Sequence, residues 1–144
     1  MFADLLARLT APAPEPASDA DARLALGALL VRIARADGDY APVEKDSIRD
    51  ILAARYPDAD VNWLLNECEA FEAEAPDTVR FTRAIKDAVA YDDRLAVVEA
   101  MWEVVLADGK RETHEDQLMR LVPPLIGIED MDSNMMRRRV ESRK

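Results

Sequence analysis

One short motif occurs twice in this chain and constrains its fold more than any other feature. The triplet Ala-Asp-Gly stands at positions 36–38 and again at 107–109, and a glutamate follows each aspartate after seven positions, at Glu44 and Glu115. The apolar flanks agree at the same offset: Leu24 with Leu95, Ala25 with Ala96, Leu26 with Val97, Leu30 with Met101, Ile33 with Val104, Ile48 with Met119 and Ile51 with Val122. Chance rarely aligns so many apolar positions, so we interpret the chain as two copies of one unit, at about 24–52 and 95–123.

Each copy is predicted to be a helix, an Asp-Gly turn and a second helix. Segments 24–34 and 95–106 are the most apolar stretches of the chain, which is typical of helices buried on all sides. Neither copy can bury its first helix alone, so we expect the two copies to pack together about a pseudo-twofold axis. The residues expected to lie between or around the two central helices are Leu30, Ile33, Met101, Trp102 and Val105.

The fold class predicted from these patterns is all-α, a bundle of about six to eight helices. Only 4 of the 144 residues are glycine, and helix-forming Ala, Leu, Glu and Arg are abundant. No stretch of five or more residues alternates strictly between apolar and polar, so no strand pattern competes. Capping residues and prolines place the helices at about 18–36, 42–56, 60–75, 76–89, 92–107, 113–125 and 132–141, with Pro123 and Pro124 expected to end or kink the sixth.

The chain is expected to hold one helical domain with a segment on either side of it. Residues 1–10 have the spacing of a short amphipathic helix, and the three prolines of residues 11–18 favour an extended linker. The domain itself is expected over 19–131. Residues 132–144 are expected to form a weakly apolar helix followed by a basic tail. The tail is expected to be solvated and frayed.

Charge and cysteine content limit the cellular compartment and the classes of partner that we expect. The formal net charge is −10, so the averaged field repels phosphate backbones, and we expect no nucleic-acid partner. Cys68 is the only cysteine, which fits a reducing compartment and a buried thiol. No secretory signal or membrane-spanning run is recognised, so we expect a cytoplasmic protein with an unidentified protein partner, while peripheral membrane association and the oligomeric state stay open.

The repeated motif resembles the TerB family, which is associated with tellurite resistance; a related TerB-like domain of a membrane-anchored co-chaperone shares the pattern. The resemblance covers about residues 19–126. It implies an all-helical fold of two related halves in an accessory domain of a stress-response system, with no defining enzymatic activity. It also implies a divalent-metal site, whose ligands in this chain would be Asp37, Glu44, Asp108 and Glu115.

Two interpretations of these four acids compete. Carboxylate oxygens suit Ca²⁺ or Mg²⁺ better than Zn²⁺, and the lone histidine His114 has no second histidine or nearby cysteine to support a zinc site. Alternatively, Gly38 and Gly109 end helices, and the two glutamates bond free amides in the first turns that follow. The first interpretation predicts a metal-responsive accessory domain, and the second a metal-free acidic interaction module. No catalytic nucleophile motif or phosphate-binding loop is present, so we expect no enzyme.

The central-helix assignment yields a stability prediction. Trp102 is the largest side chain in either segment. Replacing Trp102 by Ala should lower the free energy of unfolding by about 3 to 5 kcal/mol, as truncation of a large core side chain does. Urea unfolding followed by circular dichroism measures the change. A loss below about 1 kcal/mol would place Trp102 on the surface.

Overall fold

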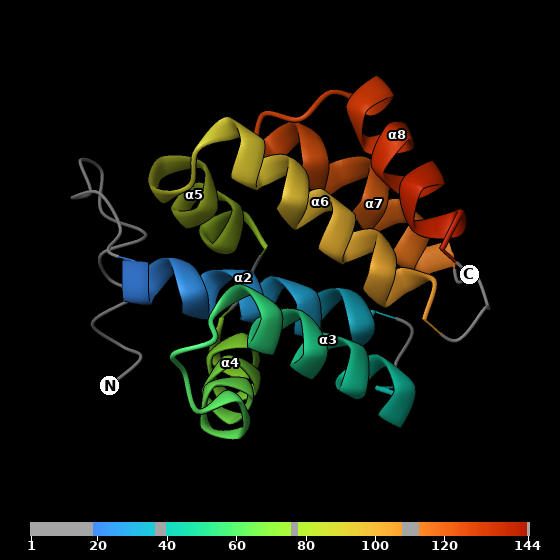
Figure 1. Cartoon of the computed structure of the whole chain (residues 1–144). Coiled ribbons are helices and arrows are strands. Elements are labelled where there is room, and N and C mark those ends of the chain that lie inside the picture. The colour runs from blue at the N-terminus through green and yellow to red at the C-terminus, as the bar shows by residue number, and fades with distance from the viewer. Residues whose placement is uncertain (1–18, 37–39, 76–77, 108–112, 144) are drawn as a thin grey trace.

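The computed structural model of the chain describes residues 19–36, 40–75, 78–107 and 113–143, apart from the side chains at 19–21, 79–80 and 113–115. Regular structure in these ranges is α-helical throughout, which confirms the all-α prediction (Figure 1). The described helices are α2 (Asp19–Ala34), α3 (Pro42–Arg55), α4 (Val61–Glu74), α5 (Val79–Ala88), α6 (Tyr91–Val105), α7 (Thr113–Leu125) and α8 (Asp130–Glu141). The helix expected over 1–10, the linker over 11–18 and the helix start expected at Pro76 lie outside the described residues.

Local signals set several helix ends where the sequence predicts them. Pro42 is the first residue of α3, where its missing N–H costs no hydrogen bond. The carboxylate of Asp60 accepts the backbone N–H of Trp63 at 3.3 Å and so caps α4. The last helix begins at Asp130, two residues before the expected start. Within the described ranges no helix is both long and apolar enough to span a membrane.

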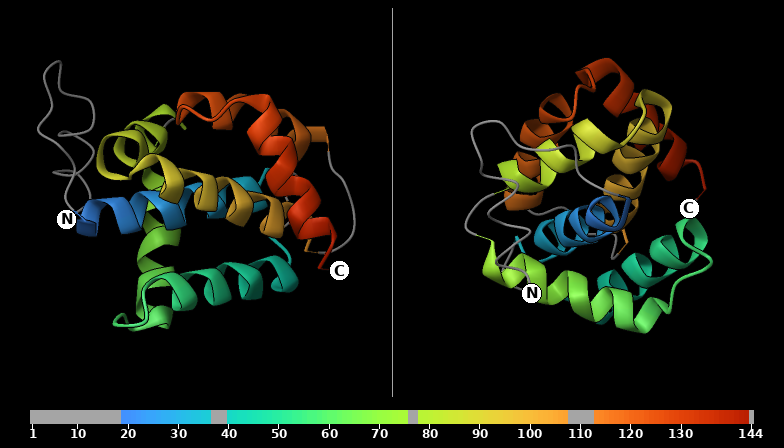
Figure 2. Two further views of the ribbon diagram at one scale, coloured as in Figure 1. Left: turned by 45° about the horizontal axis from the view of Figure 1, so that its top comes forward. Right: turned by 90° about the vertical axis from the view of Figure 1, so that its left-hand side faces the viewer.

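Helix α2 lies in the middle of the molecule and contacts five other helices. Figures 1 and 2 show α3 and α4 on one side of α2, and α5, α6 and α7 on the other. Its buried side chains are Ala22, Ala25, Leu26, Ala28, Leu29, Leu30, Val31, Ile33 and Ala34. Such a helix must be apolar on nearly every face, as the sequence predicts.

The predicted pairing of the two central helices is confirmed, because α2 contacts α6. All five residues expected at this centre are buried: Leu30, Ile33, Met101, Trp102 and Val105. The twofold relation between the two repeats stays a prediction.

The closest approach of α2 to α4 depends on a glycine. A Cβ atom added to Gly27 would lie 2.2 Å from the Sγ atom of Cys68, far inside van der Waals contact. Cys68 is fully buried, as predicted. Glycine at position 27 therefore makes room for the thiol between the two helices.

The two prolines near the end of α7 are accommodated in its last turn. The helix ends at Leu125, as expected, and the backbone N–H of Ile128 donates to the carbonyl of Pro123 at 2.9 Å. The N–H of Gly127 donates to the carbonyl of Pro124 at 3.0 Å, and Gly127 adopts φ of 79°. This is a Schellman motif, in which glycine takes the left-handed position and two free carbonyls find donors.

Helix α8 covers the face of α6 that carries Trp102. The indole N–H of Trp102 donates to the hydroxyl of Ser133 at 3.2 Å, and the guanidinium of Arg137 lies 5.4 Å from the indole ring centre. Ser133, Met136 and Val140 of α8 are buried. Trp102 thus joins the last helix to the central pair.

Two arginines of the C-terminal segment reach α6. The guanidinium of Arg143 donates to Glu103 at 3.0 Å and also contacts Glu99, and Arg139 lies 3.5 Å from the same Glu99 carboxylate. Both glutamates belong to α6. The side chains of Arg139 and Arg143 stay 64% and 50% exposed, so these ion pairs lie at the surface, and the fraying expected of the tail stays a prediction.

The Gly27 contact yields a prediction about coupled stability. Gly27→Ala should destabilise the native state by about 1 to 3 kcal/mol through overpacking against Cys68, although alanine is the better helix former. The cost should fall clearly in a Cys68→Ala background, where the sulfur is gone. A double-mutant cycle from urea unfolding measures this coupling. Additive losses would show that the two residues do not compete for space.

Candidate functional site

The structure places one of the four acids predicted to bind a metal. Glu44 is described in full, Glu115 is described only by its backbone in the first turn of α7, and Asp37 and Asp108 lie outside the described residues. Among the side chains that the structure describes, no three His, Cys, Asp or Glu residues come together as a metal site. The predicted four-acid site therefore stays a prediction.

Glu44 lies in the first turn of α3 and is 2% exposed. One of its carboxylate oxygens accepts the backbone N–H of Ala41 at 3.2 Å. This contact is one half of a capping box, since the side chain of Ala41 has no acceptor to complete the other half. A carboxylate here also meets the positive end of the helix dipole. The geometry is the one that the capping interpretation predicts for Glu44.

Tyr40 stands directly before this cap, and its hydroxyl is enclosed. The hydroxyl oxygen is buried, and the carboxylate of Glu69 lies beside it. Burial, and next the neighbouring carboxylate of Glu69, raise the pKa of Tyr40 above its ordinary value. The guanidinium of Arg35 lies 5.1 Å from the centre of its ring. Tyr40, two positions after the first motif, is therefore a neutral phenol that lies between the end of α2 and α4.

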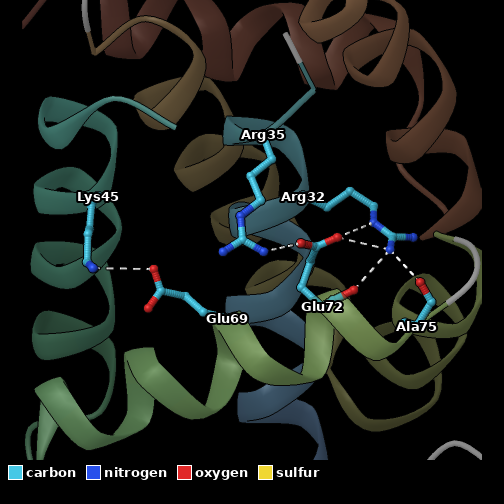
Figure 3. Close-up of polar contacts among 6 residues, drawn as sticks. All are labelled: Arg32, Arg35, Lys45, Glu69, Glu72 and Ala75. Atoms are coloured by element: carbon cyan, nitrogen blue, oxygen red, sulfur yellow. Dashed lines mark hydrogen bonds and ion pairs between the residues drawn. The ribbon is translucent and has the colours of Figure 1, made fainter. Parts of the chain in front are cut away.

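A half-buried ion-pair network joins α2 to the end of α4 (Figure 3). The carboxylate of Glu72 accepts from Arg32 Nε at 3.0 Å and from Arg35 Nη1 at 2.6 Å. Arg32 also donates to the backbone carbonyls of Glu72 at 3.2 Å and of Ala75 at 2.7 Å. These carbonyls lie at the C-terminal end of α4 and its cap residue, where the helix dipole favours a cation. Arg32 therefore acts as the C-terminal cap of α4.

A second, weaker ion pair joins α3 to α4. Lys45 Nζ lies 3.5 Å from a carboxylate oxygen of Glu69, one turn before Glu72 (Figure 3). Arg35 just after α2, Lys45 of α3 and the acids of α4 thus lie near the start of α3, where Glu44 lies. This cluster fixes three helices around the segment that follows the first motif.

The flanks of the two motifs meet at a hollow between α3 and α6. Val43, which precedes Glu44, and Ala107, which precedes Asp108, both line this hollow of about 380 Å³. Chain neighbours of Glu44 and Asp108 therefore line one hollow, although the Glu44 side chain does not line it and Asp108 lies outside the described residues. Spacing along the sequence did not show this.

The fold and the repeated motif together define a class of protein, an all-helical domain organised around one buried helix. The family model described as "Tellurite resistance protein TerB" matches residues 23–138. Because this range covers most of the chain, the protein belongs to the TerB family. No curated protein and no solved structure matched the chain in the same comparisons.

The network around Glu72 and the enclosed phenol of Tyr40 were missed from the sequence. A signal was present, because Arg32 interrupts the apolar run 24–34 with Arg35 three positions later, and an enclosed cation needs a partner. The partner lies about forty positions further along the chain, and no local spacing points to it. Only the packing of α4 on α2 brings the charges together.

The Glu72 network predicts a specific loss of stability. Glu72→Gln keeps the shape but presents an amide in place of the carboxylate that two guanidinium groups share, so it should cost roughly 1.5 to 3 kcal/mol. Glu74→Gln, at an exposed position two residues later on the same helix, should change stability by less than about 0.5 kcal/mol. Chemical unfolding of both variants compares them. Equal effects would mean that the network contributes nothing beyond a surface ion pair.

Proposed function

We propose that this TerB-family protein is a non-catalytic accessory domain of a cytoplasmic stress-response system of the tellurite-resistance type. In this proposal the acids of the two repeats, Asp37, Glu44, Asp108 and Glu115, hold a divalent cation. Ca²⁺ or Mg²⁺ is favoured over Zn²⁺, because all four donors are carboxylates and both ions prefer oxygen ligands.

The shared hollow between α3 and α6 is the observation that carries this proposal. Val43 and Ala107 line it together, and each is the immediate neighbour of a proposed ligand. Residues adjacent to Glu44 and Asp108 therefore lie at one site, although the two acids are 64 positions apart in the chain. This placement is what a cation site shared by both repeats requires.

The chemistry of the donors supports the same proposal. Carboxylates that converge repel each other, and a bound cation removes this repulsion. Glu44 adds a carboxylate in a buried position. Little water is present there to weaken the attraction between the carboxylate and a cation. A bound Ca²⁺ or Mg²⁺ would tie the start of α3 to the start of α7 and so stabilise the native arrangement.

A second candidate function is a metal-free acidic module that binds a protein partner. The capping contact from Ala41 to Glu44 favours it, because the contact gives this glutamate a structural role that needs no cation. The net charge of −10 suits a basic partner. In both candidates the domain acts by binding, and no residue is assigned a catalytic role.

Thermal unfolding with and without cations separates the two candidates. In the cation proposal, millimolar Ca²⁺ or Mg²⁺ raises the melting temperature above that in EDTA, since an ion at a hundred times its Kd stabilises the native state by about 2.7 kcal/mol. Asp37→Asn should abolish most of this rise while leaving the melt in EDTA almost unchanged. Asp87→Asn, at an exposed position of α5, should keep the rise in full.

The capping alternative predicts a different set of melts. Wild type would then unfold identically in EDTA and in each cation, and calorimetry would show no heat of binding. Glu44→Ala would still cost about 0.3 to 1 kcal/mol through the lost first-turn contact. That combination of results would rule out the cation proposal and favour the metal-free acidic module.

A further inference from the structure

A continuous groove runs between α3 and α6 over the surface of α2. It consists of the hollow of about 380 Å³ described above and an adjoining one of about 260 Å³. Ile51, Ala54 and Glu103 line both hollows. Helices α3 and α6 therefore form the two walls of one surface feature.

Many of the side chains that line the groove are small and apolar. Ala54 on α3, Ala96 and Ala100 on α6 and Ala107 just after α6 line it, and small side chains on both walls let a third element approach the two backbones closely. Val43 at one end is 44% exposed, although it is apolar. A groove of this kind, bounded by two helices, has the shape that accepts the apolar stripe of an amphipathic helix.

The charges along the groove favour a basic occupant. Asp46, Asp50 and Glu103 line it, against the single cation Arg55. Asp50 is exposed and forms no ion pair with any residue that the structure describes. Glu103 already holds a guanidinium, since Arg143 donates to it at 3.0 Å. Asp46 likewise accepts from Arg49 at 2.8 Å, so this rim binds cations within the chain itself, and Asp50 is left for a cation of a partner.

From this shape and this charge we infer that the groove between α3 and α6 is the docking site for a basic amphipathic helix of a protein partner. The apolar stripe of that helix lies over Ile51 and Ala54, and a lysine or arginine side chain reaches Asp50, beside the carboxylates of Asp46 and Glu103 that Arg49 and Arg143 already hold. The groove includes the hollow that supports the cation proposal, but the inference does not depend on a bound cation, because none of these contacts uses Asp37, Glu44, Asp108 or Glu115.

Binding of a synthetic helix to the full chain tests this inference. The probe is an 18-residue helical peptide that has leucines along one face, at spacings i, i+3, i+4 and i+7, and lysines at the other positions. A matched control peptide carries glutamate in place of every lysine. Calorimetry or fluorescence anisotropy at low salt measures both affinities. The lysine peptide should bind, about tenfold or more tightly than the glutamate peptide, and more weakly as salt rises.

Two pairs of variants locate the binding. Asp50→Lys should weaken the lysine peptide about tenfold, while Asp87→Lys makes the same charge change on α5 and should leave affinity within about twofold. Ala54→Gln fills the groove without changing the charge and should also weaken binding about tenfold. Its control is Ala53→Gln, at the neighbouring exposed position that does not line the groove. Circular dichroism confirms that all four variants fold.

Several results would overturn the inference. Absence of binding to wild type would do so, as would equal losses in the groove variants and in their controls, which would indicate general charge attraction. Self-association of the chain that Ala54→Gln abolishes would instead assign the groove to a second copy. Asp37→Asn should not alter peptide binding in EDTA, so failure of the cation site and failure of the groove are separate outcomes.

Discussion

The burial of α2 on all sides is the constraint on which the rest of the structure depends. Five helices contact this one element, so nearly every side chain on it must be apolar, small or internally paired. Gly27 makes room for Cys68 of α4, and Arg32 is tolerated because the end of α4 supplies a carboxylate and two carbonyls that accept from it. The same arginine thereby ends α4 and fixes its position on α2. A single apolar helix thus determines where its neighbours lie and how one of them ends.

The position of α3 and α6 on this central helix brings the two repeats together at the surface. Both helices pack on α2 and contact each other. The segment after the first motif and the segment at the end of α6 therefore line the same hollow. The cation site and the helix-binding groove proposed above are neighbours for this reason. They draw on different residues, and each is consistent with a domain that works by binding.

The fold could be predicted from the sequence to a large extent, because its signals are local. Apolar periodicity located α2 and α6, Pro42 and Asp60 located the starts of α3 and α4, and the repeat predicted that the two apolar helices pair. The candidate site was harder to predict, since its contacts join distant segments. The pairing of Arg143 with Glu103 and of Arg32 with Glu72 depends on which helix faces which, and charge pattern alone carries no such information. Of the four predicted ligands the structure describes the side chain of Glu44 alone, in a cap that the sequence also predicted.

The tight contact between Gly27 and Cys68 also has a chemical consequence. Burial, and then the carboxylates of Glu69 and Glu67, raise the pKa of the Cys68 thiol to about 12, so almost none of it is thiolate at neutral pH. Oxidants and electrophiles react with the thiolate and need access to it. In the native state the chain's single sulfhydryl is therefore chemically silent, and the folded domain offers oxidants no reactive sulfur. Its reactivity would return only when α2 and α4 separate, which makes the rate of thiol modification a direct measure of how often this core opens.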